Sequence, residues 1–256
     1  MKVIIPMSGL GSRFIAAGYE YPKPLIKVHD KPIIEWVVKM FSPEDEFVFI
    51  CRDEHIRNTN LVSELRRIKP EGQIISIENH KRGPVYAVSR IFDQLRDDEP
   101  LLISYCDYYM RWNYAGFKKM ILNSEIDGSV PCYSGFHPNL LPKKNLYAGC
   151  LKDNQNYLLE IKEKFSFAED KAKGFHSPGV YFFKDGATVK KYFQMALDED
   201  LSLNSEFYVS LVYQLMLRDK KKIYVYDEVN FFCQWGTPED LDEYLFWLNQ
   251  VKNFSA

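Results

Sequence analysis

The chain has 256 residues and a nearly balanced charge, with 33 Lys and Arg against 35 Asp and Glu. This balance argues against extensive nucleic-acid binding, because neutralising phosphates takes an excess of basic residues. The 46% hydrophobic and 27% charged contents are typical of a globular protein, and no apolar run approaches the roughly 20 residues that span a bilayer. The five scattered cysteines form no CxxC motif, which argues against disulfides and a zinc cage.

These features predict one domain over residues 1–256, with a cytoplasmic location and neither a membrane nor a nucleic-acid partner. The apolar start before Pro6 is too short for a signal peptide. The sequence leaves the oligomeric state open, and a homodimer is one candidate.

The first half of the chain alternates strand-like and helix-like segments. Short apolar runs predict strands, and apolar residues at helical spacing predict helices. The order β-α-β-α indicates parallel strands with right-handed crossovers and helices on both faces. The expected strands are Lys2–Pro6, Glu46–Cys51, Gln73–Ile77 and Pro100–Cys106, and the expected helices are Lys31–Phe41, a polar helix ending at Arg67, and Gly83–Leu95.

The pattern changes from Gly128 onward, where short strands alternate with turns before helices return. We expect an α/β fold with a mostly parallel sheet flanked by helices and a smaller antiparallel acceptor or lid lobe. Residues 1–127 would then bind a nucleotide and residues 128–256 an acceptor. The expected strands are Gly128–Tyr133, Tyr147–Lys152 and Tyr157–Glu163, and the expected helices are Asp185–Leu197, Ser205–Leu217 and Pro238–Val251.

The loop after the first strand has the composition of an anion-binding loop. It reads Met7-Ser8-Gly9-Leu10-Gly11-Ser12-Arg13. Two glycines let the backbone approach a ligand closely, and successive N–H groups can form an anion nest. The loop lacks the Walker pattern and the third glycine of GxGxxG. A simple turn between strand and helix is the alternative interpretation.

Two further charged residues follow at positions suited to a phosphate site. Lys23 stands between Pro22 and Pro24, and the prolines restrict the backbone that holds its ammonium group. Asp107 follows the fourth strand, at the edge where open α/β sheets bind ligands, and a carboxylate there suits Mg²⁺. Taken alone, either residue could equally be a solvated turn lysine or a capping aspartate.

Together these motifs resemble the nucleotidyltransferase family that includes hexose-1-phosphate and phosphocholine nucleotidyltransferases. The resemblance implies a Rossmann-like, GT-A-like fold and Mg²⁺ as cofactor. Later segments also look like family motifs: the Glu-Lys pair Glu163-Lys164 at an acceptor, Gly179 in a Gly-x-Tyr-x-Phe strand, and Gly236-Thr237-Pro238. By resemblance, Lys164, Glu163 and Gly179 bind the acceptor.

The chain departs from the family pattern at two places. Gln234 stands where sugar-nucleotide members have a second metal-binding Asp, and an amide is a weaker Mg²⁺ ligand. Glu206 is the candidate replacement beside Asp107, with Asp227 and Glu228 as further alternatives. The segment before Gly83, at the expected nucleobase pocket, also differs from the family pattern; it reads Glu78-Asn79-His80-Lys81-Arg82.

The predicted reaction is attack by an acceptor phosphate on the α-phosphorus of a nucleoside triphosphate, which expels pyrophosphate. An anionic acceptor needs no general base, so catalysis would rest on positioning and charge neutralisation. Arg13 and Lys23 are the expected catalytic residues, and Asp107 and Glu206 the expected metal ligands. The expected nucleotide-binding residues are Met7, Ser8, Gly9, Leu10, Gly11, Asn79 and Gly83.

The chain as a whole looks most like the capsule-biosynthesis members, which implies CTP as donor and L-glutamine phosphate as acceptor. Three alternatives remain open. The first is a sugar 1-phosphate as acceptor, and the second is a nucleotide-binding protein with weak or no turnover. The third is a glycosyltransferase, although Asp107-Tyr108-Tyr109 lacks the expected Asp-x-Asp motif.

Overall fold

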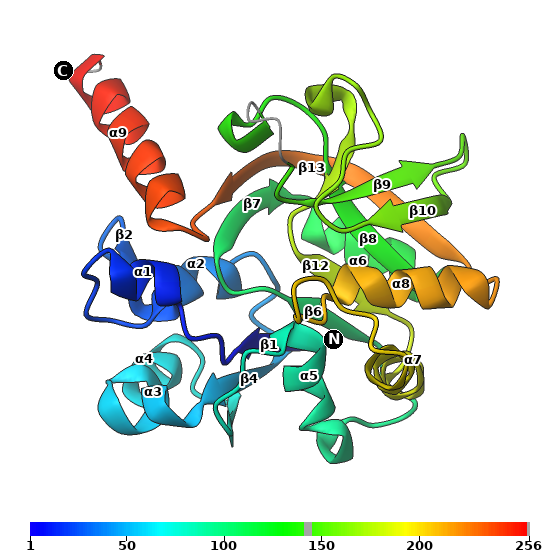
Figure 1. Ribbon diagram of the computed structural model, residues 1–256, viewed down its shortest axis with the longest axis horizontal. Coiled ribbons are helices and arrows are strands. Elements are labelled where there is room, and N and C mark those ends of the chain that lie inside the picture. The colour runs from blue at the N-terminus through cyan, green and yellow to red at the C-terminus, as the bar shows by residue number, and fades with distance from the viewer. Residues whose placement is uncertain (141–144, 255–256) are drawn as a thin grey trace.

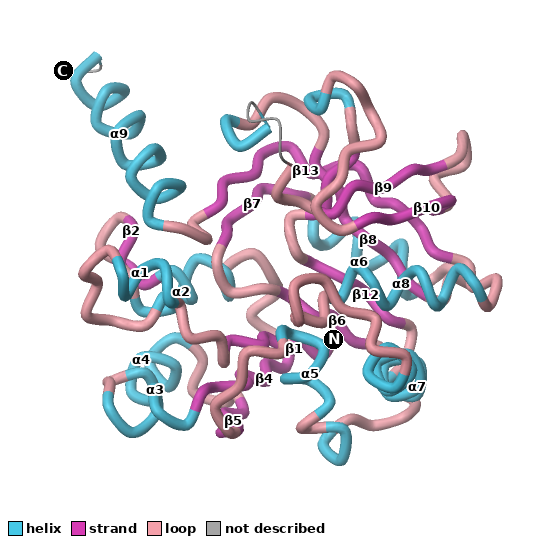
Figure 2. The backbone as a smooth tube through the Cα atoms, viewed as in Figure 1, coloured by secondary structure: helices cyan, strands magenta, loops and turns pink. Residues whose placement is uncertain are grey.

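The computed structural model describes residues 1–140 and 145–254 (Figure 1). Within these residues one 11-stranded sheet runs through the molecule (Figure 2). Four of its strands are parallel, in the order β6-β1-β4-β5. Their carboxyl ends therefore share one edge of the sheet, where the loops after β1, β5 and β6 open together. These strands are β1 (Lys2–Met7), β4 (Glu46–Arg52), β5 (Gln73–Ile77) and β6 (Leu101–Ser104).

The sheet continues from β6 through mostly antiparallel strands, in the order β6-β12-β8-β11-β9-β10. The long strand β13 pairs parallel with β8 and antiparallel with β7. A separate hairpin pairs β2 with β3. The bounds are β2 (Lys27–Val28), β3 (Lys31–Pro32), β7 (Tyr108–Trp112), β8 (Gly128–Tyr133), β9 (Ala148–Lys152), β10 (Leu158–Lys162), β11 (Phe175–Ser177), β12 (Val180–Phe183) and β13 (Ile223–Gln234).

Helices cover both faces of the sheet. The described helices are α1 (Ser12–Ala16), α2 (Ile33–Val38), α3 (Asp53–Asn58), α4 (Leu61–Ile68), α5 (Gly83–Ser89), α6 (Tyr114–Leu122), α7 (Gly186–Asp198), α8 (Val209–Arg218) and α9 (Pro238–Phe254). Most of α9 extends away from the body of the molecule (Figure 1).

Two hydrophobic cores follow from the alternation of side chains along the strands. In β1, Val3 and Ile5 enter the core beneath α2, α4 and α6, whereas Ile4 enters the core beneath α5, α7 and α8. All three side chains are fully buried. This two-sided burial explains the continuous apolar run at the start of the chain, and it confirms the predicted α/β class with helices on both faces.

The structure confirms most predicted elements and corrects several boundaries. Gln73–Ile77 and Gly128–Tyr133 are strands with the predicted bounds. The helix expected from Lys31 begins only at Ile33, because residues 31–32 pair with β2. The polar helix before Arg67 is two helices, α3 and α4, interrupted at Thr59, which has an extended backbone.

Two further boundary corrections affect the site. The helix expected from Ser205 begins at Val209, because Asn204 and Ser205 both have positive φ angles and turn the chain. Glu206 therefore lies in a turn and not in a helix. The fourth strand ends at Ser104, so Asp107 lies in the connection to β7.

The sequence analysis did not predict β7, α6 or β13. All five cysteines are buried and free, as expected. In the part of the chain that the structure describes, no helix combines the length and the apolar content needed to cross a membrane.

Gly149 in β9 allows the segment that follows β10 to pack closely against β9. A Cβ there would stand 2.3 Å from the carbonyl oxygen of Phe165. We predict that Gly149→Ala lowers the free energy of unfolding by about 1–3 kcal/mol, because backbone has to move. Urea denaturation followed by circular dichroism measures this change. The control is Gly9→Ala, where a Cβ meets open space; equal losses in both variants would contradict the steric argument.

Candidate functional site

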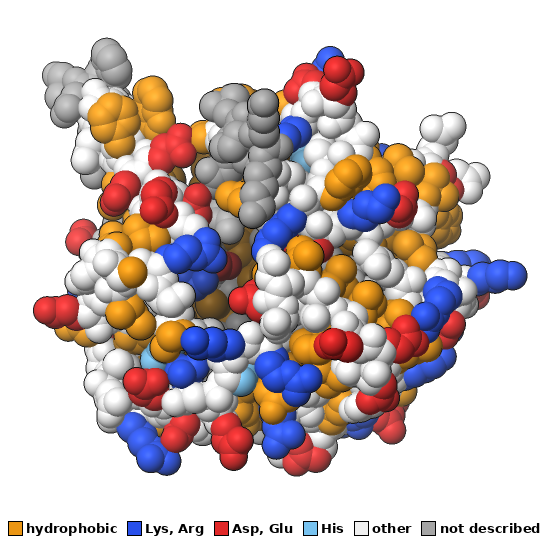
Figure 3. Space-filling view, viewed as in Figure 1, with side chains coloured by type: hydrophobic (Ala, Val, Ile, Leu, Met, Phe, Trp, Pro, Cys, Tyr) orange, Lys and Arg blue, Asp and Glu red, His pale blue; other side chains and the backbone are white. Residues whose placement is uncertain are grey.

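A cavity of about 610 Å³ opens at the carboxyl edge of the parallel strands, between the two parts of the sheet. The space-filling view shows a hollow near the centre of the face, with Lys and Arg side chains at its rim (Figure 3). Its lining includes 13 of the 14 residues predicted for the site: Met7, Ser8, Gly9, Leu10, Gly11, Arg13, Lys23, Gly83, Asp107, Glu163, Lys164, Gly179 and Glu206. Asn79 is exposed and is not part of the lining.

The loop between β1 and α1 forms one wall of this cavity. Gly11 has a φ of 68°, a left-handed conformation that glycine adopts at little cost. A Cβ on Gly11 would meet Cβ of Lys23 at 3.8 Å, so the loop passes directly over this lysine. Arg13 also lines the cavity, and none of the ion pairs found between described residues includes it. Its charge is therefore available to a ligand.

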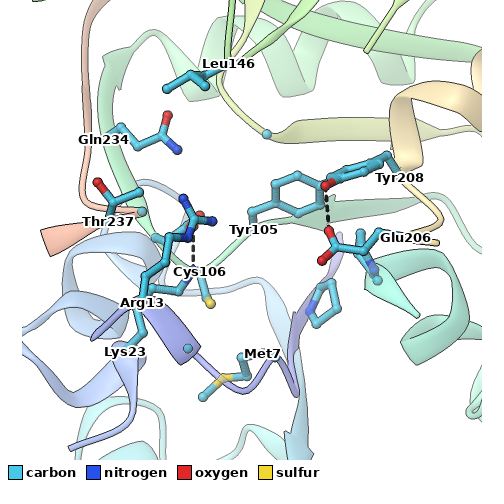
Figure 4. Close-up of a pocket in the computed structure, with 18 of the residues that line it drawn as sticks. Met7, Arg13, Lys23, Tyr105, Cys106, Leu146, Glu206, Tyr208, Gln234 and Thr237 are labelled. Atoms are coloured by element: carbon cyan, nitrogen blue, oxygen red, sulfur yellow. Dashed lines mark hydrogen bonds and ion pairs between the residues drawn. The ribbon is translucent and has the colours of Figure 1, made fainter. Parts of the chain in front are cut away.

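Lys23 and Asp107 form the central ion pair of the site (Figure 4). Nζ of Lys23 donates to Oδ2 of Asp107 at 2.7 Å, across 84 positions of the chain. Burial alone would lower the pKa of Lys23, but the Asp107 carboxylate outweighs it and holds the pKa above its usual value. Lys23 therefore carries a full positive charge inside the cavity. The prolines on either side place it at the start of a single 3₁₀ turn, Lys23–Leu25.

The cysteine next to Asp107 is inert. Burial raises the pKa of the Cys106 thiol to about 12, so the thiol stays protonated and is a poor nucleophile.

Gln234 lies beside Asp107, as the family pattern predicts for the second ligand position. A Cβ on Gly236 would meet the Gln234 amide nitrogen at 2.6 Å and Asp107 Oδ2 at 3.2 Å, so both polar groups crowd the same glycine. The Trp235 N–H also donates to the Asp107 carbonyl at 2.8 Å. These contacts fix the end of β13 against the turn that carries Asp107.

Glu206 does not join Asp107. Figure 4 shows Lys23 and Gln234 on one side of the cavity, and Glu206 and Tyr208 on the other. Asp227, an alternative ligand, pairs with Lys152 instead. Within residues 1–140 and 145–254 there is no group of three or more His, Cys, Asp or Glu arranged to hold a metal ion.

Ser8 and His80 connect the loops after β1 and β5. The backbone N–H of Arg82 donates to Nδ1 of His80 at 3.2 Å, so the neutral ring carries its proton on Nε2. Nε2 then donates to Oγ of Ser8 at 2.8 Å. The Ser8 hydroxyl proton is consequently left to donate to another group. Burial, with the charges of Arg52 and Arg82, lowers the pKa of His80, which favours this neutral form.

Gly83 holds the loop after β5 against the segment before α8. It has a φ of 82°, and a Cβ there would lie 2.8 Å from the Phe207 backbone nitrogen. The Phe207 N–H donates to Arg82 O at 2.9 Å, and Val85 N–H donates to Phe207 O at 3.1 Å. Only glycine fits this close approach without moving the backbone.

The far side of the cavity contains the Glu-Lys pair. Glu163 follows β10 and accepts a hydrogen bond from the Ser210 hydroxyl. Burial raises the pKa of Glu163. Nζ of Lys164 donates to the Tyr208 hydroxyl at 3.1 Å. Gly179, with a φ of 111°, packs against the ring of Tyr105, which also lines the cavity.

Sequence reasoning missed Tyr105 and Tyr208 as site residues. Tyr105 precedes Asp107 closely enough that its position after the fourth strand could have suggested a role. Nothing in the sequence singles out Tyr208, because its partners Lys164 and Glu206 come together only through folding.

The fold and the cavity define the class of protein: an α/β domain whose cavity, at the carboxyl edge of its parallel strands, is lined by a glycine loop and by Arg13 and Lys23. Residues 3–154 match the model of the MobA-like NTP transferase domain. The chain belongs to this family.

Similar proteins agree with this assignment. A bifunctional protein GlmU from Thermosipho africanus is 29% identical over 107 residues, which is 42% of this chain and 22% of that protein. The chain thus matches about a fifth of that relative's length. A UTP–glucose-1-phosphate uridylyltransferase from Haemophilus ducreyi is 47% identical over 38 residues, 15% of this chain and 13% of that protein.

Solved structures share the fold over nearly the whole chain. A nucleoside-diphosphate-sugar pyrophosphorylase from Vibrio cholerae has a TM-score of 0.76 at 18% identity, covering 95% of this chain and 99% of its own. The inositol-1-phosphate CTP transferase from T. maritima has a TM-score of 0.69 at 17% identity, covering 96% and 94%.

The lowered pKa of His80 predicts a pH effect on stability. The folded protein takes up this proton at lower pH than the unfolded chain does, so His80 contributes to a loss of stability as the pH falls below the usual histidine pKa. We expect His80→Gln to weaken the decrease in unfolding free energy between pH 7 and pH 5. Urea denaturation at both pH values measures it.

The control for this experiment is Asn79→Ala, which alters the same loop without removing a titratable group. A pH dependence in His80→Gln equal to that of the wild type would contradict the prediction. The buried His137, whose pKa burial lowers to about 4, keeps its contribution in both proteins.

Proposed function

We propose that the chain is a nucleotidyltransferase that transfers a nucleoside monophosphate from a triphosphate to a phosphorylated acceptor, releasing pyrophosphate. The observation that carries this proposal is the Lys23–Asp107 pair at 2.7 Å beneath the glycine loop. The pair places a cation and a carboxylate in the cavity that the glycine loop also lines, and such groups suit the binding and neutralisation of phosphates. Family membership and the shared fold support the same activity.

Each group has a role in this reaction. The backbone of Gly9 and Gly11 would cradle the triphosphate, and Arg13 would bind the departing pyrophosphate. The Lys23 ammonium would neutralise charge that develops at the α-phosphate. Lys164 would bind the acceptor phosphate on the opposite side of the cavity. Because the acceptor oxygen is already anionic, the reaction needs neither a general base nor a covalent nucleophile.

A magnesium ion fits the residues that are present. Mg²⁺ in proteins is commonly held by one or two carboxylates together with substrate phosphates. Asp107 supplies the carboxylate in the cavity lining that would hold the ion. Gln234 also lines the cavity, with its amide nitrogen on the side of Gly236. When bound, the ion would neutralise phosphate charge.

For the substrates we propose CTP and L-glutamine phosphate, as in the CTP:phosphoglutamine cytidylyltransferase of capsular phosphoramidate synthesis. The whole-chain sequence resemblance supports this choice, and one structural neighbour is an inositol-1-phosphate CTP transferase. The alternative acceptor is a sugar 1-phosphate, supported by the pyrophosphorylase neighbour. We further propose that residues 1–127 bind the nucleotide, residues 128–256 bind the acceptor, and the reaction occurs in the cytoplasm.

Pyrophosphate release tests the proposal directly. We expect Mg²⁺-dependent release with CTP and L-glutamine phosphate, and loss of release in Asp107→Asn. The same assay compares CTP with four other triphosphates: UTP, dTTP, GTP and ATP. It also compares L-glutamine phosphate with two other acceptors, glucose 1-phosphate and phosphocholine. Release with another pair would replace the proposed substrates and keep the reaction. Tight CTP binding without release for any acceptor would favour a nucleotide-binding protein without turnover, with Gln234 as the first residue to examine.

Lys23→Ala tests the role of the partly buried ammonium. We expect kcat to fall by about 10²–10³-fold, the usual loss when one charge-stabilising group is removed from a transition state. The nucleotide affinity should change far less. Steady-state kinetics and calorimetric CTP titration measure the two effects. Lys27→Ala, an exposed lysine outside the cavity, is the matched control. An unchanged kcat would remove Lys23 from the mechanism.

A further inference from the structure

Three side chains on the acceptor side of the cavity form a continuous line of hydrogen bonds. Nζ of Lys164 donates to the Tyr208 hydroxyl at 3.1 Å, and this hydroxyl donates to Oε2 of Glu206 at 2.5 Å. The Lys164 ammonium also lies 4.9 Å from the centre of the Tyr208 ring. All three residues line the cavity, and Figure 4 shows the bond between Tyr208 and Glu206.

The two charged ends of this line keep unused bonding capacity. Among the described residues, no ion pair includes Lys164 or Glu206, and no hydrogen bond reaches Oε1 of Glu206. An ammonium has three donors and a carboxylate about four acceptor positions, so a single hydroxyl satisfies neither group. Both groups can therefore bind a ligand that enters the cavity.

The backbone on both sides holds the line in place. The backbone before Glu206 forms a turn in which Leu203 and Glu206 exchange hydrogen bonds: Leu203 N–H donates to Glu206 O at 2.9 Å, and Glu206 N–H donates to Leu203 O at 3.1 Å. On the other flank Phe207 bonds to the loop around Gly83. Lys164 has a left-handed backbone with a φ of 55°, a strained conformation for a lysine that aims its side chain into the cavity.

We propose that Lys164, Tyr208 and Glu206 form an acceptor subsite for a small molecule that bears a phosphate and, a few bonds away, an ammonium or hydroxyl donor. This inference rests on the proposed function. The phosphate binds the Lys164 ammonium, and the donor binds the free oxygen of Glu206. Tyr208 is a positioning residue that holds the two opposite charges apart at a fixed separation.

The charges of the subsite also fix the orientation of the acceptor. A phosphate is attracted by Lys164 and repelled by Glu206, so the reverse placement is disfavoured. A ligand with a phosphate but no donor leaves Oε1 of Glu206 without a partner, since Tyr208 bonds only to Oε2. The subsite therefore selects an acceptor by its second functional group as well as by its phosphate.

Steady-state kinetics of Glu206→Gln and Tyr208→Phe test the subsite. We expect Glu206→Gln to raise the KM for the acceptor roughly 10- to 100-fold, the equivalent of losing one hydrogen bond to a charged group. The KM for the nucleotide should stay within about twofold. Tyr208→Phe keeps the ring over Lys164 but removes the hydroxyl, and should raise the acceptor KM by a smaller factor.

Tyr226→Phe is the matched control. Tyr226 also donates to a glutamate two positions away, Oε2 of Glu228 at 3.0 Å, but it is not part of the cavity lining. It should leave the acceptor KM unchanged. An unchanged acceptor KM in Glu206→Gln, or an equal rise in the nucleotide KM, would overturn the proposal.

Three acceptors distinguish the chemical classes: L-glutamine phosphate offers an ammonium, glucose 1-phosphate offers hydroxyls, and phosphocholine offers a cation without a hydrogen-bond donor. A wild-type preference for phosphocholine would overturn the donor requirement. Calorimetric titration of each acceptor separates this inference from the proposed function. Binding that Glu206→Gln weakens, without any turnover in the wild type, would support the subsite and overturn the transferase. No binding of any of the three would overturn the subsite.

Discussion

The ion pair between Lys23 and Asp107 links the parts of the molecule on which the site depends. It joins the proline-bounded turn after α1 to the connection between β6 and β7, and Gly11 lies directly over it. In the absence of ligand the two charges satisfy each other inside the cavity. In the proposed reaction a triphosphate would compete with Asp107 for the ammonium, so the partly buried cation stays paired until a ligand replaces Asp107. The glycine loop and the two prolines hold the Lys23 backbone in position.

The rest of the architecture brings a second set of groups to face this pair. β12 pairs antiparallel with β6, which makes the second part of the sheet continuous with the first. The N–H of Tyr105 donates to Gly179 O at 2.9 Å and extends this contact to the cavity. Glu163 and Lys164 follow β10 at the outer edge of the sheet. The cavity therefore has one side with Arg13, Lys23 and Asp107 and an opposite side with Lys164 and Glu206.

Site residues could be predicted from the sequence where a local pattern marks them, but not where their role depends on a contact between residues far apart in the chain. Lys23 could be predicted because it stands between two prolines, and Asp107 because it comes soon after an apolar strand. Parallel strands also end at one edge of the sheet, where ligands bind. The bond between Ser8 and His80 spans 72 positions and that between Lys164 and Tyr208 spans 44. No local pattern encodes such pairs. The start of α8 was misplaced for a related reason, since positive φ angles at two non-glycine residues are not a sequence signal.

Gln234 stands where the family resemblance leads us to expect a second carboxylate, and this difference changes the charge of the site. A carboxylate there would add a second negative charge beside Asp107, and one lysine could not neutralise both. The amide adds no charge, so Lys23 and Asp107 remain a neutral pair. In the proposed reaction, an incoming triphosphate would meet less repulsion at this edge, and Arg13 would add attraction. The site therefore depends more on its own cations for charge balance than a site with two carboxylates does.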